Sequence, residues 1–196
     1  MTLLIVMAVA MTTTRADITG SAHNFSGKGW GSSEICIFCH TPHNAASPQL
    51  APLWNHSPTL ANFTLYSSST LHNTPGQPGN ESKACLSCHD GSVAIDSFGS
   101  RTGAQMMSGG ALIGVDLSND HPIGITMYHD SRDGALRCQN CHNMHLSPSM
   151  ISPLPFFSGK VECATCHDPH NKTPGNSKLL RKPITGSELC LHCHAK

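Results

Sequence analysis

The stretch Cys163–Asn171, C-A-T-C-H-D-P-H-N, places two thiols and two imidazoles within nine residues. Two cysteines separated by two residues and followed at once by histidine form the attachment signature of c-type haem. Cys163 and Cys166 would form thioethers to the haem vinyl groups, and His167 would ligate the iron. His170 lies on the wrong side of that porphyrin to reach its far face. We therefore expect His170 to ligate a second haem packed alongside.

The same five-residue motif occurs five times and uses all ten cysteines of the chain. The predicted attachment cysteines are Cys36, Cys39, Cys85, Cys88, Cys138, Cys141, Cys163, Cys166, Cys190 and Cys193, and the predicted near-side ligands are His40, His89, His142, His167 and His194. A disulfide framework or zinc sites would use paired cysteines, but neither needs a histidine after every pair. The sequence therefore predicts five covalently attached c-type haems.

Of the 14 histidines, nine remain as candidates for the far side of the irons. His43, His145 and His170 follow their motif histidines at the same distance, and a proline before His43 and His170 helps to aim them outward. His121 precedes a proline, which favours an extended backbone suited to presenting an imidazole. The chain therefore contains enough histidines to give each of the five irons a second axial ligand.

Four further histidines are less strongly indicated. His23 lies in a glycine-rich arm, His56 follows P-L-W-N, and His72 and His129 are possible ligands in loops. His192 sits inside its own motif and ranks last. Methionine ligation would raise a haem potential, but we expect the methionines mainly to pack against porphyrin.

Composition predicts a mostly irregular fold with a few short α-helices and a core formed by the five haems. The chain has only ten aromatic residues, with 17 glycines and 13 prolines. A side-chain core for 196 residues would need more large apolar groups. We expect each attachment motif to form one or two helical turns. The first cysteines of successive motifs lie 49, 53, 25 and 27 residues apart, which favours a continuous chain of cofactors.

Residues 1–16 form a short apolar run followed by small polar residues, typical of a secretory signal peptide. We expect cleavage after Ala16 and one pentahaem domain over residues 17–196. Lys plus Arg and Asp plus Glu number 12 each, with no basic run, so nucleic-acid binding is not expected. No segment is long enough to make an integral membrane protein.

These motifs resemble those of multihaem c-type cytochromes with doubled CxxCH motifs. C-H-T-P-H-N…C-L-S-C-H and C-H-D-P-H-N…C-L-H-C-H look like two copies of the doubled unit, with C-Q-N-C-H-N-M-H between them. The chain also resembles small extracellular cytochromes that polymerise into filaments. The likeness lies in its size, its export signal, its P-L-W-N loop and its N-D-H-P segment. The familiar filament subunits of this size carry four haems.

The resemblance implies electron transfer along an unbroken haem stack. It also implies that a histidine of one subunit ligates a haem of the next, with His23, His56 and His72 as candidates. The expected partners are other copies of the chain, other redox proteins and extracellular electron acceptors. The expected location is outside the cell, with the periplasm as the second choice. A soluble periplasmic shuttle is one alternative. A nitrite or hydroxylamine reductase is another, but such enzymes often replace the motif histidine by lysine, and C-x-x-C-K does not occur here. We expect no enzymatic activity.

Overall fold

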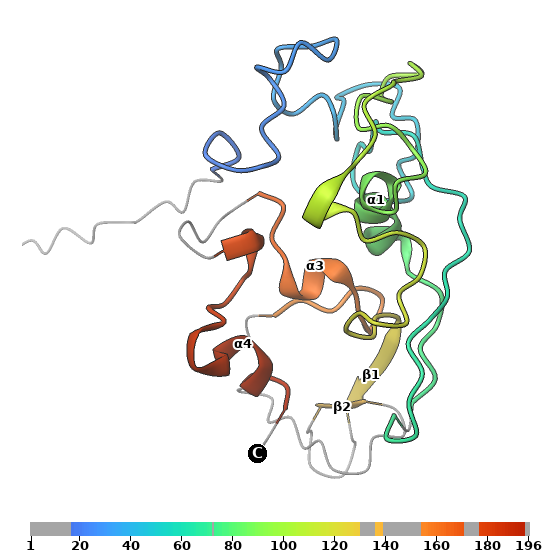
Figure 1. Cartoon of the computed structure of the whole chain (residues 1–196), viewed down its shortest axis with the longest axis vertical. Helices are drawn as coiled ribbons and strands as arrows, with labels where there is room; N and C mark the ends of the chain where they lie inside the picture. The colour runs from blue at the N-terminus through green and yellow to red at the C-terminus, as the bar shows by residue number, and fades with distance from the viewer. Residues whose placement is uncertain (1–16, 72, 130–135, 139–153, 171–176, 195–196) are drawn as a thin grey trace, which may run out of the picture.

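The computed structural model describes residues 17–71, 73–129, 136–138, 154–170 and 177–194. Most of this chain is irregular and connects short elements (Figure 1). The elements are α1 (Asn80–His89), η1 (Gly109–Ala111), β1 (Ile125–His129), β2 (Leu136–Cys138), β3 (Lys160–Val161), α3 (Cys163–Cys166), η2 (Ser177–Leu179), η3 (Thr185–Ser187) and α4 (Glu188–Leu191). The predicted irregular chain with a few short helices is confirmed, whereas the predicted signal peptide lies outside the described residues.

Helix α1 contains the whole second motif. Its sequence, N-E-S-K-A-C-L-S-C-H, is rich in residues that favour helix. Glu81 lies in its first turn and His89 in its last, where both complement the helix dipole. Leu86 faces inward and forms a small core with Phe63 and Leu117. The helix therefore fixes both thiols of the motif and the histidine relative to this apolar cluster.

The first motif forms a single turn, and only the first residue of the third motif is described. In the first motif, the His40 amide donates to the Cys36 carbonyl at 2.8 Å. Ile37 has a lower helix propensity than Leu86, which stands at the equivalent position of the second motif, and Cys36 is exposed. The third motif begins at the end of a strand, since Cys138 closes β2.

A three-stranded sheet has the order β2-β1-β3, and both pairings are antiparallel. Met127 pairs with Cys138 on one side of β1, and Ile125 pairs with Val161 on the other. Strands this short carry too few residues for an alternating pattern, so the sequence analysis did not predict them. Because α3 begins two residues after β3, the sheet ties the start of the third motif to the fourth.

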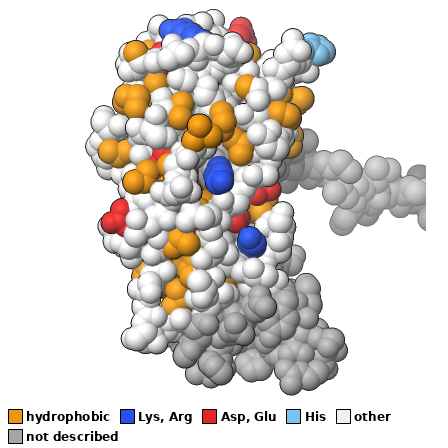
Figure 2. Space-filling view, turned by 90° about the vertical axis from the view of Figure 1, so that its right-hand side faces the viewer, with side chains coloured by type: hydrophobic (Ala, Val, Ile, Leu, Met, Phe, Trp, Pro, Cys, Tyr) orange, Lys and Arg blue, Asp and Glu red, His pale blue; other side chains and the backbone are white. Residues whose placement is uncertain are grey.

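The side-chain core is small, as the composition predicts. Phe38 packs at 5.3 Å from Phe25 and 4.7 Å from Phe98, measured between ring centroids. Other apolar side chains reach the surface at several places along one face (Figure 2). Leu60 is 90% exposed and Ile184 62% exposed. None of the helices in the described ranges is long and apolar enough to cross a membrane.

Candidate haem-attachment and ligand sites

The described attachment cysteines form one row through the molecule. Burial, with a further contribution from nearby Cys39, raises the pKa of the Cys88 thiol to about 12. A hydrogen bond to Cys163, together with burial, raises the pKa of Cys85 well above its ordinary value. The fifth motif continues the row, because Cys193 adds to the burial that raises the pKa of Cys166 to about 11.

The spatial order of the described motifs is therefore first, second, fourth and fifth. Figure 1 shows α1, α3 and α4 following one another down the molecule, although β1 and β2 separate α1 from α3 in the sequence. Cys141 and His142 of the third motif lie outside the described residues, as do His72 and His145. For Cys138 and His129 only the strand pairing is described.

Three motif histidines are held in the same way, by a backbone carbonyl against Nδ1. His40 Nδ1 lies 2.7 Å from the Pro52 oxygen. His89 Nδ1 lies 2.8 Å from the Ala111 oxygen, and His167 Nδ1 lies 2.8 Å from the Lys178 oxygen. A metal-binding histidine is usually oriented by a carbonyl at its other nitrogen, which fixes the tautomer. The arrangement leaves Nε2 of each ring as the nitrogen for iron.

Residues 36–55, the first copy, share one local arrangement with residues 163–170 and 177–181, the second copy. In the first copy, His40 bridges to Trp54 in an antiparallel pair, and the Asn55 amide donates to the Cys39 carbonyl. In the second, His167 bridges to Leu180, and the Arg181 amide donates to the Cys166 carbonyl.

The returning loop of each copy contains a leucine in the left-handed region. Leu53 has φ 57° in the first copy and Leu179 has φ 57° in the second. Left-handed backbone is costly for leucine, so the surrounding hydrogen bonds must hold it. The duplication extends the C-H-x-P-H-N match seen in the sequence and makes His43 the structural equivalent of His170.

Three pairs of imidazole rings face each other at nearly equal separations. His40 and His170 have ring centroids 6.1 Å apart with 19° between their planes. His89 and His23 are 6.2 Å apart at 63°, and His194 and His121 are 6.2 Å apart at 74°. Each pair joins one motif histidine to one histidine predicted as a far-side ligand.

These separations fit an iron between the two rings. A metal–imidazole bond is about 2 Å long and the ring centre lies about 1.1 Å further on, so rings on opposite faces of one iron are about 6.3 Å apart. Burial, with His89 close by, lowers the pKa of His23. A neutral imidazole is the form that binds metal. His23, expected from the sequence to reach a neighbouring subunit, thus lies against a motif histidine of its own chain.

His56 is placed differently from the prediction that it is a ligand. It is 1% exposed, with Nδ1 at 2.8 Å from the Ser57 oxygen and Nε2 at 3.0 Å from the Ala94 oxygen. Both ring nitrogens are therefore engaged by the backbone, and no motif histidine of the described chain faces this ring. Nε2 also lies 3.4 Å from Cys88 Sγ. The geometry assigns His56 to holding the loop against the second motif.

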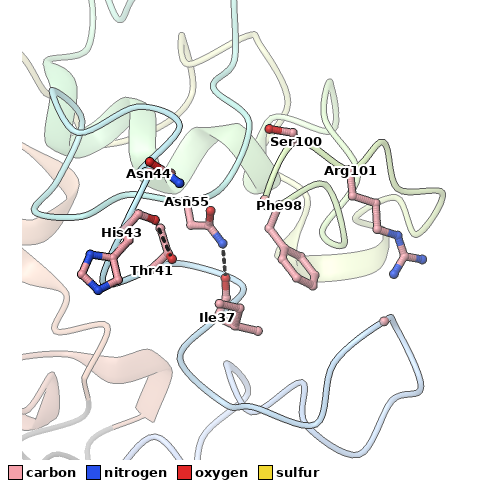
Figure 3. A pocket seen from close by; sticks show the side chains of 10 residues that line it. Ile37, Thr41, His43, Asn44, Asn55, Phe98, Ser100 and Arg101 are labelled. Carbon is pink, nitrogen blue, oxygen red and sulfur yellow. Dashed lines mark hydrogen bonds between the residues drawn. The ribbon is translucent and has the colours of Figure 1, made fainter.

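His43 lies at the rim of a pocket of about 510 Å³ beside the first motif. Ile37, Asn55, Phe98 and Arg101 also line this pocket. In Figure 3 the imidazole of His43 points away from Phe98 and Arg101. The side chain is exposed, and within the described ranges it makes no ring contact with another histidine.

Three buried hydrogen-bond donors were not singled out by the sequence analysis. Trp54 Nε1, Asn73 Nδ2 and His192 Nε2 find no acceptor in the part of the chain that the structure describes. Buried donors without a partner are rare in folded proteins. Trp54 also packs edge-on against His40, with 5.7 Å between ring centroids. Haem propionates are acceptors of the required kind, so these donors fit the cofactor as well as the ligand pairs do.

Comparison with known families agrees with these motifs. Residues 155–196 match a family model described as doubled CXXCH motif. The chain carries the motifs of a haem c electron-transfer protein. The matched part of this haem c protein contains its fourth and fifth motifs, with α3 and α4. No curated protein matches the chain.

Proposed function

We propose that the protein carries electrons along five covalently attached haems, each with histidine on both faces of its iron. The observation that carries this proposal is the set of three ring pairs at 6.1–6.2 Å. We assign His170 to the haem of the first motif, His23 to that of the second and His121 to that of the fifth. The fourth and third motifs would draw their second ligands from the remaining histidines.

The residues of the chain position and insulate the cofactors. Bound haem supplies one-electron chemistry at iron, with the potential set by its ligands and surroundings. Carbonyls of Pro52, Ala111 and Lys178 hold the near-side rings. With both axial positions filled, no iron offers a place for substrate, so we propose a carrier and not an enzyme. The row of neighbouring cysteines supports a path in which each haem lies beside the next.

Mass and spectra of the purified holoprotein test this proposal. Mass spectrometry should show five haems per chain, and the oxidised spectrum should be low-spin throughout. Added cyanide or nitrite should leave that spectrum unchanged. Fewer than five haems, or an iron that accepts either ligand without any mutation, would contradict the proposal. A nitrite-dependent oxidation of the reduced protein would favour the reductase alternative.

We also propose that the protein is exported and assembles into filaments. The duplicated structure supports this, because His170 of the second copy lies against His40 of the first. His43 is the equivalent of His170, and its exposed ring has no histidine against it within the described ranges. Repeating the relation between the copies in a second molecule would place His43 against His167 of the neighbouring molecule. A head-to-tail contact of this kind produces a filament when the rotation between successive molecules does not close a ring.

His43→Ala tests the assembly separately from electron transfer. The variant should retain all five haems but lose filaments under the electron microscope, with one iron per chain becoming open to cyanide. Asn44→Gly, at the neighbouring exposed position, is the matched control and should assemble normally, because glycine tolerates the left-handed backbone found there (φ 53°). Filaments of normal length in His43→Ala would reject this contact, while a monomeric wild-type protein with five closed irons would leave the shuttle as the function.

A further inference from the structure

A buried carboxylate joins the second and fourth attachment motifs. Glu162 is 1% exposed and Ser82 is fully buried. The Glu162 carboxylate accepts the Gly79 amide at 3.2 and 3.1 Å and the Ser82 hydroxyl. Ser82 Oγ in turn accepts the Cys163 amide at 2.9 Å. The hydrogen bonds thus run from the start of α1 to the first cysteine of α3.

The same carboxylate caps both helices. Gly79 is the N-cap of α1 and supplies no side chain of its own, so Glu162 takes that role from α3. Glu162 is also the N-cap of α3, in a capping box with Thr165. A Cβ atom at Gly79 would lie 2.6 Å from Glu162 Oε1, so only glycine lets the carboxylate approach this closely. Two positive helix ends therefore converge on one negative charge.

This arrangement brings together thiols that the sequence separates widely. The thiol of Cys85, in the middle of α1, and that of Cys163, the first residue of α3, lie within hydrogen-bonding reach of each other. The charged groups that face the carboxylate are Glu81 and Lys160. Burial raises the pKa of Glu162, and the Ser82 and Gly79 donors oppose that shift. Two hydrogen-bond donors, the Gly79 amide and the Ser82 hydroxyl, stabilise the charged form of the carboxylate against that burial.

We infer that Glu162 positions an electron-transfer junction between the haems of the second and fourth motifs, and that its charge lowers the reduction potential of both. The inference rests on the proposed function, because it needs haem at both motifs. A negative charge in a poorly solvated position favours the ferric over the ferrous iron, which carries one positive charge less. One electron crosses the junction, oxidising one iron and reducing the other, and no bond forms or breaks. Electrons enter and leave through external redox proteins.

Glu162→Gln in the holoprotein tests the charge while preserving the size of the side chain. Two of the potentials resolved by spectroelectrochemical titration should move upward, with haem content and spectrum unchanged. Glu162→Asp keeps the charge, so its two potentials should stay closer to those of the wild type than the potentials of Glu162→Gln do. A merely structural role would shift the potentials of both variants equally. Glu188→Gln is the matched control, because Glu188 also precedes a motif but its side chain is 54% exposed. It should move no potential measurably.

Ser82→Ala provides a second test. The Ser82 hydroxyl stabilises the charged carboxylate, so its removal favours the neutral carboxyl and the same two potentials should move upward, as in Glu162→Gln. If Glu162→Gln does not acquire its haems, Ser82→Ala still tests the inference. Unchanged potentials in Ser82→Ala and Glu162→Gln, with five closed haems retained, would overturn the inference but leave the proposed function standing. Missing haems in the wild-type protein would instead remove the proposed function itself.

Discussion

The imidazole rings of His40 and His170 lie 6.1 Å apart with only 19° between their planes. His40 belongs to the first motif, whereas His170 follows the fourth, so the contact connects the two copies of the duplicated structure. The Pro52 carbonyl holds His40 from behind, and the His170 amide donates to Asp168 Oδ1 at 3.1 Å. The carbonyl therefore orients the ring of His40, and Asp168 holds the backbone of His170 beside it.

Substitution of His170 should open one iron per chain. His170→Ala is expected to add a high-spin component to the oxidised spectrum and to bind one equivalent of cyanide, because the first-motif haem loses its second nitrogen. His170→Met should instead keep the iron closed and raise one potential, as methionine ligation does in cytochromes c. His192→Ala serves as the control, since its ring is not in any of the three pairs. An entirely low-spin His170→Ala protein would show that the pair is not axial.

The three ring pairs should be distinguishable by electron paramagnetic resonance. The 19° pair is close to parallel, whereas the 63° and 74° pairs are closer to perpendicular. Perpendicular axial imidazoles make two iron d orbitals nearly equal in energy, and this produces strongly anisotropic low-spin signals. We expect at least two such signals and at least one ordinary rhombic signal. The rhombic signal should disappear in His170→Ala, and its persistence there would contradict the assignment of His170 to the first motif.

Asp168 should lower the potential of the first-motif haem. Its carboxylate is almost fully buried, 3.8 Å from His170 Nδ1 and 3.8 Å from Arg181 Nη1. Asp168→Thr introduces the residue found at the equivalent position, Thr41, and removes the charge. We expect one potential to rise by on the order of 1 kcal/mol per electron, from a buried charge acting at an effective dielectric of about 20.

Arg181→Gln is the matched experiment for Asp168, because it removes a positive charge from the same pair. The same potential should fall in that variant, and redox titration followed by absorbance measures both shifts. Movement in the same direction in both variants would indicate a change in packing and not in charge.

His56 should make the protein less stable in acid. Burial lowers its pKa below the ordinary 6.5, outweighing the Ser57 and Ala94 carbonyls, which raise it. The unfolded chain therefore binds more protons than the folded one just below pH 6.5, so stability is complete above that pH and falls as the pH drops through the lowered pKa. Denaturant midpoints between pH 7.5 and 5 measure the slope. His56→Asn, which cannot titrate, should be less stable overall but should lose part of this slope; an unchanged slope would point to other groups.

The attachment motifs could be recognised from the sequence alone. A motif such as Cys163–His167 needs only five consecutive residues, so its meaning does not depend on the rest of the fold. The scarcity of large apolar residues likewise indicated irregular chain with few helices. The short strands were not predicted, because so few residues give no alternating pattern and tertiary hydrogen bonds decide their pairing.

The sequence by itself determined where haem attaches, which histidines are available and that little side-chain core exists. Only the tertiary structure decided which histidine meets which motif, since His23, His56 and His121 look alike as isolated residues in loops. The structure set His23 and His121 against motif histidines and engaged both nitrogens of His56 with carbonyls. Ligand pairing depends on how distant loops close on one another, and that closure is a property of the whole chain and not of any local pattern.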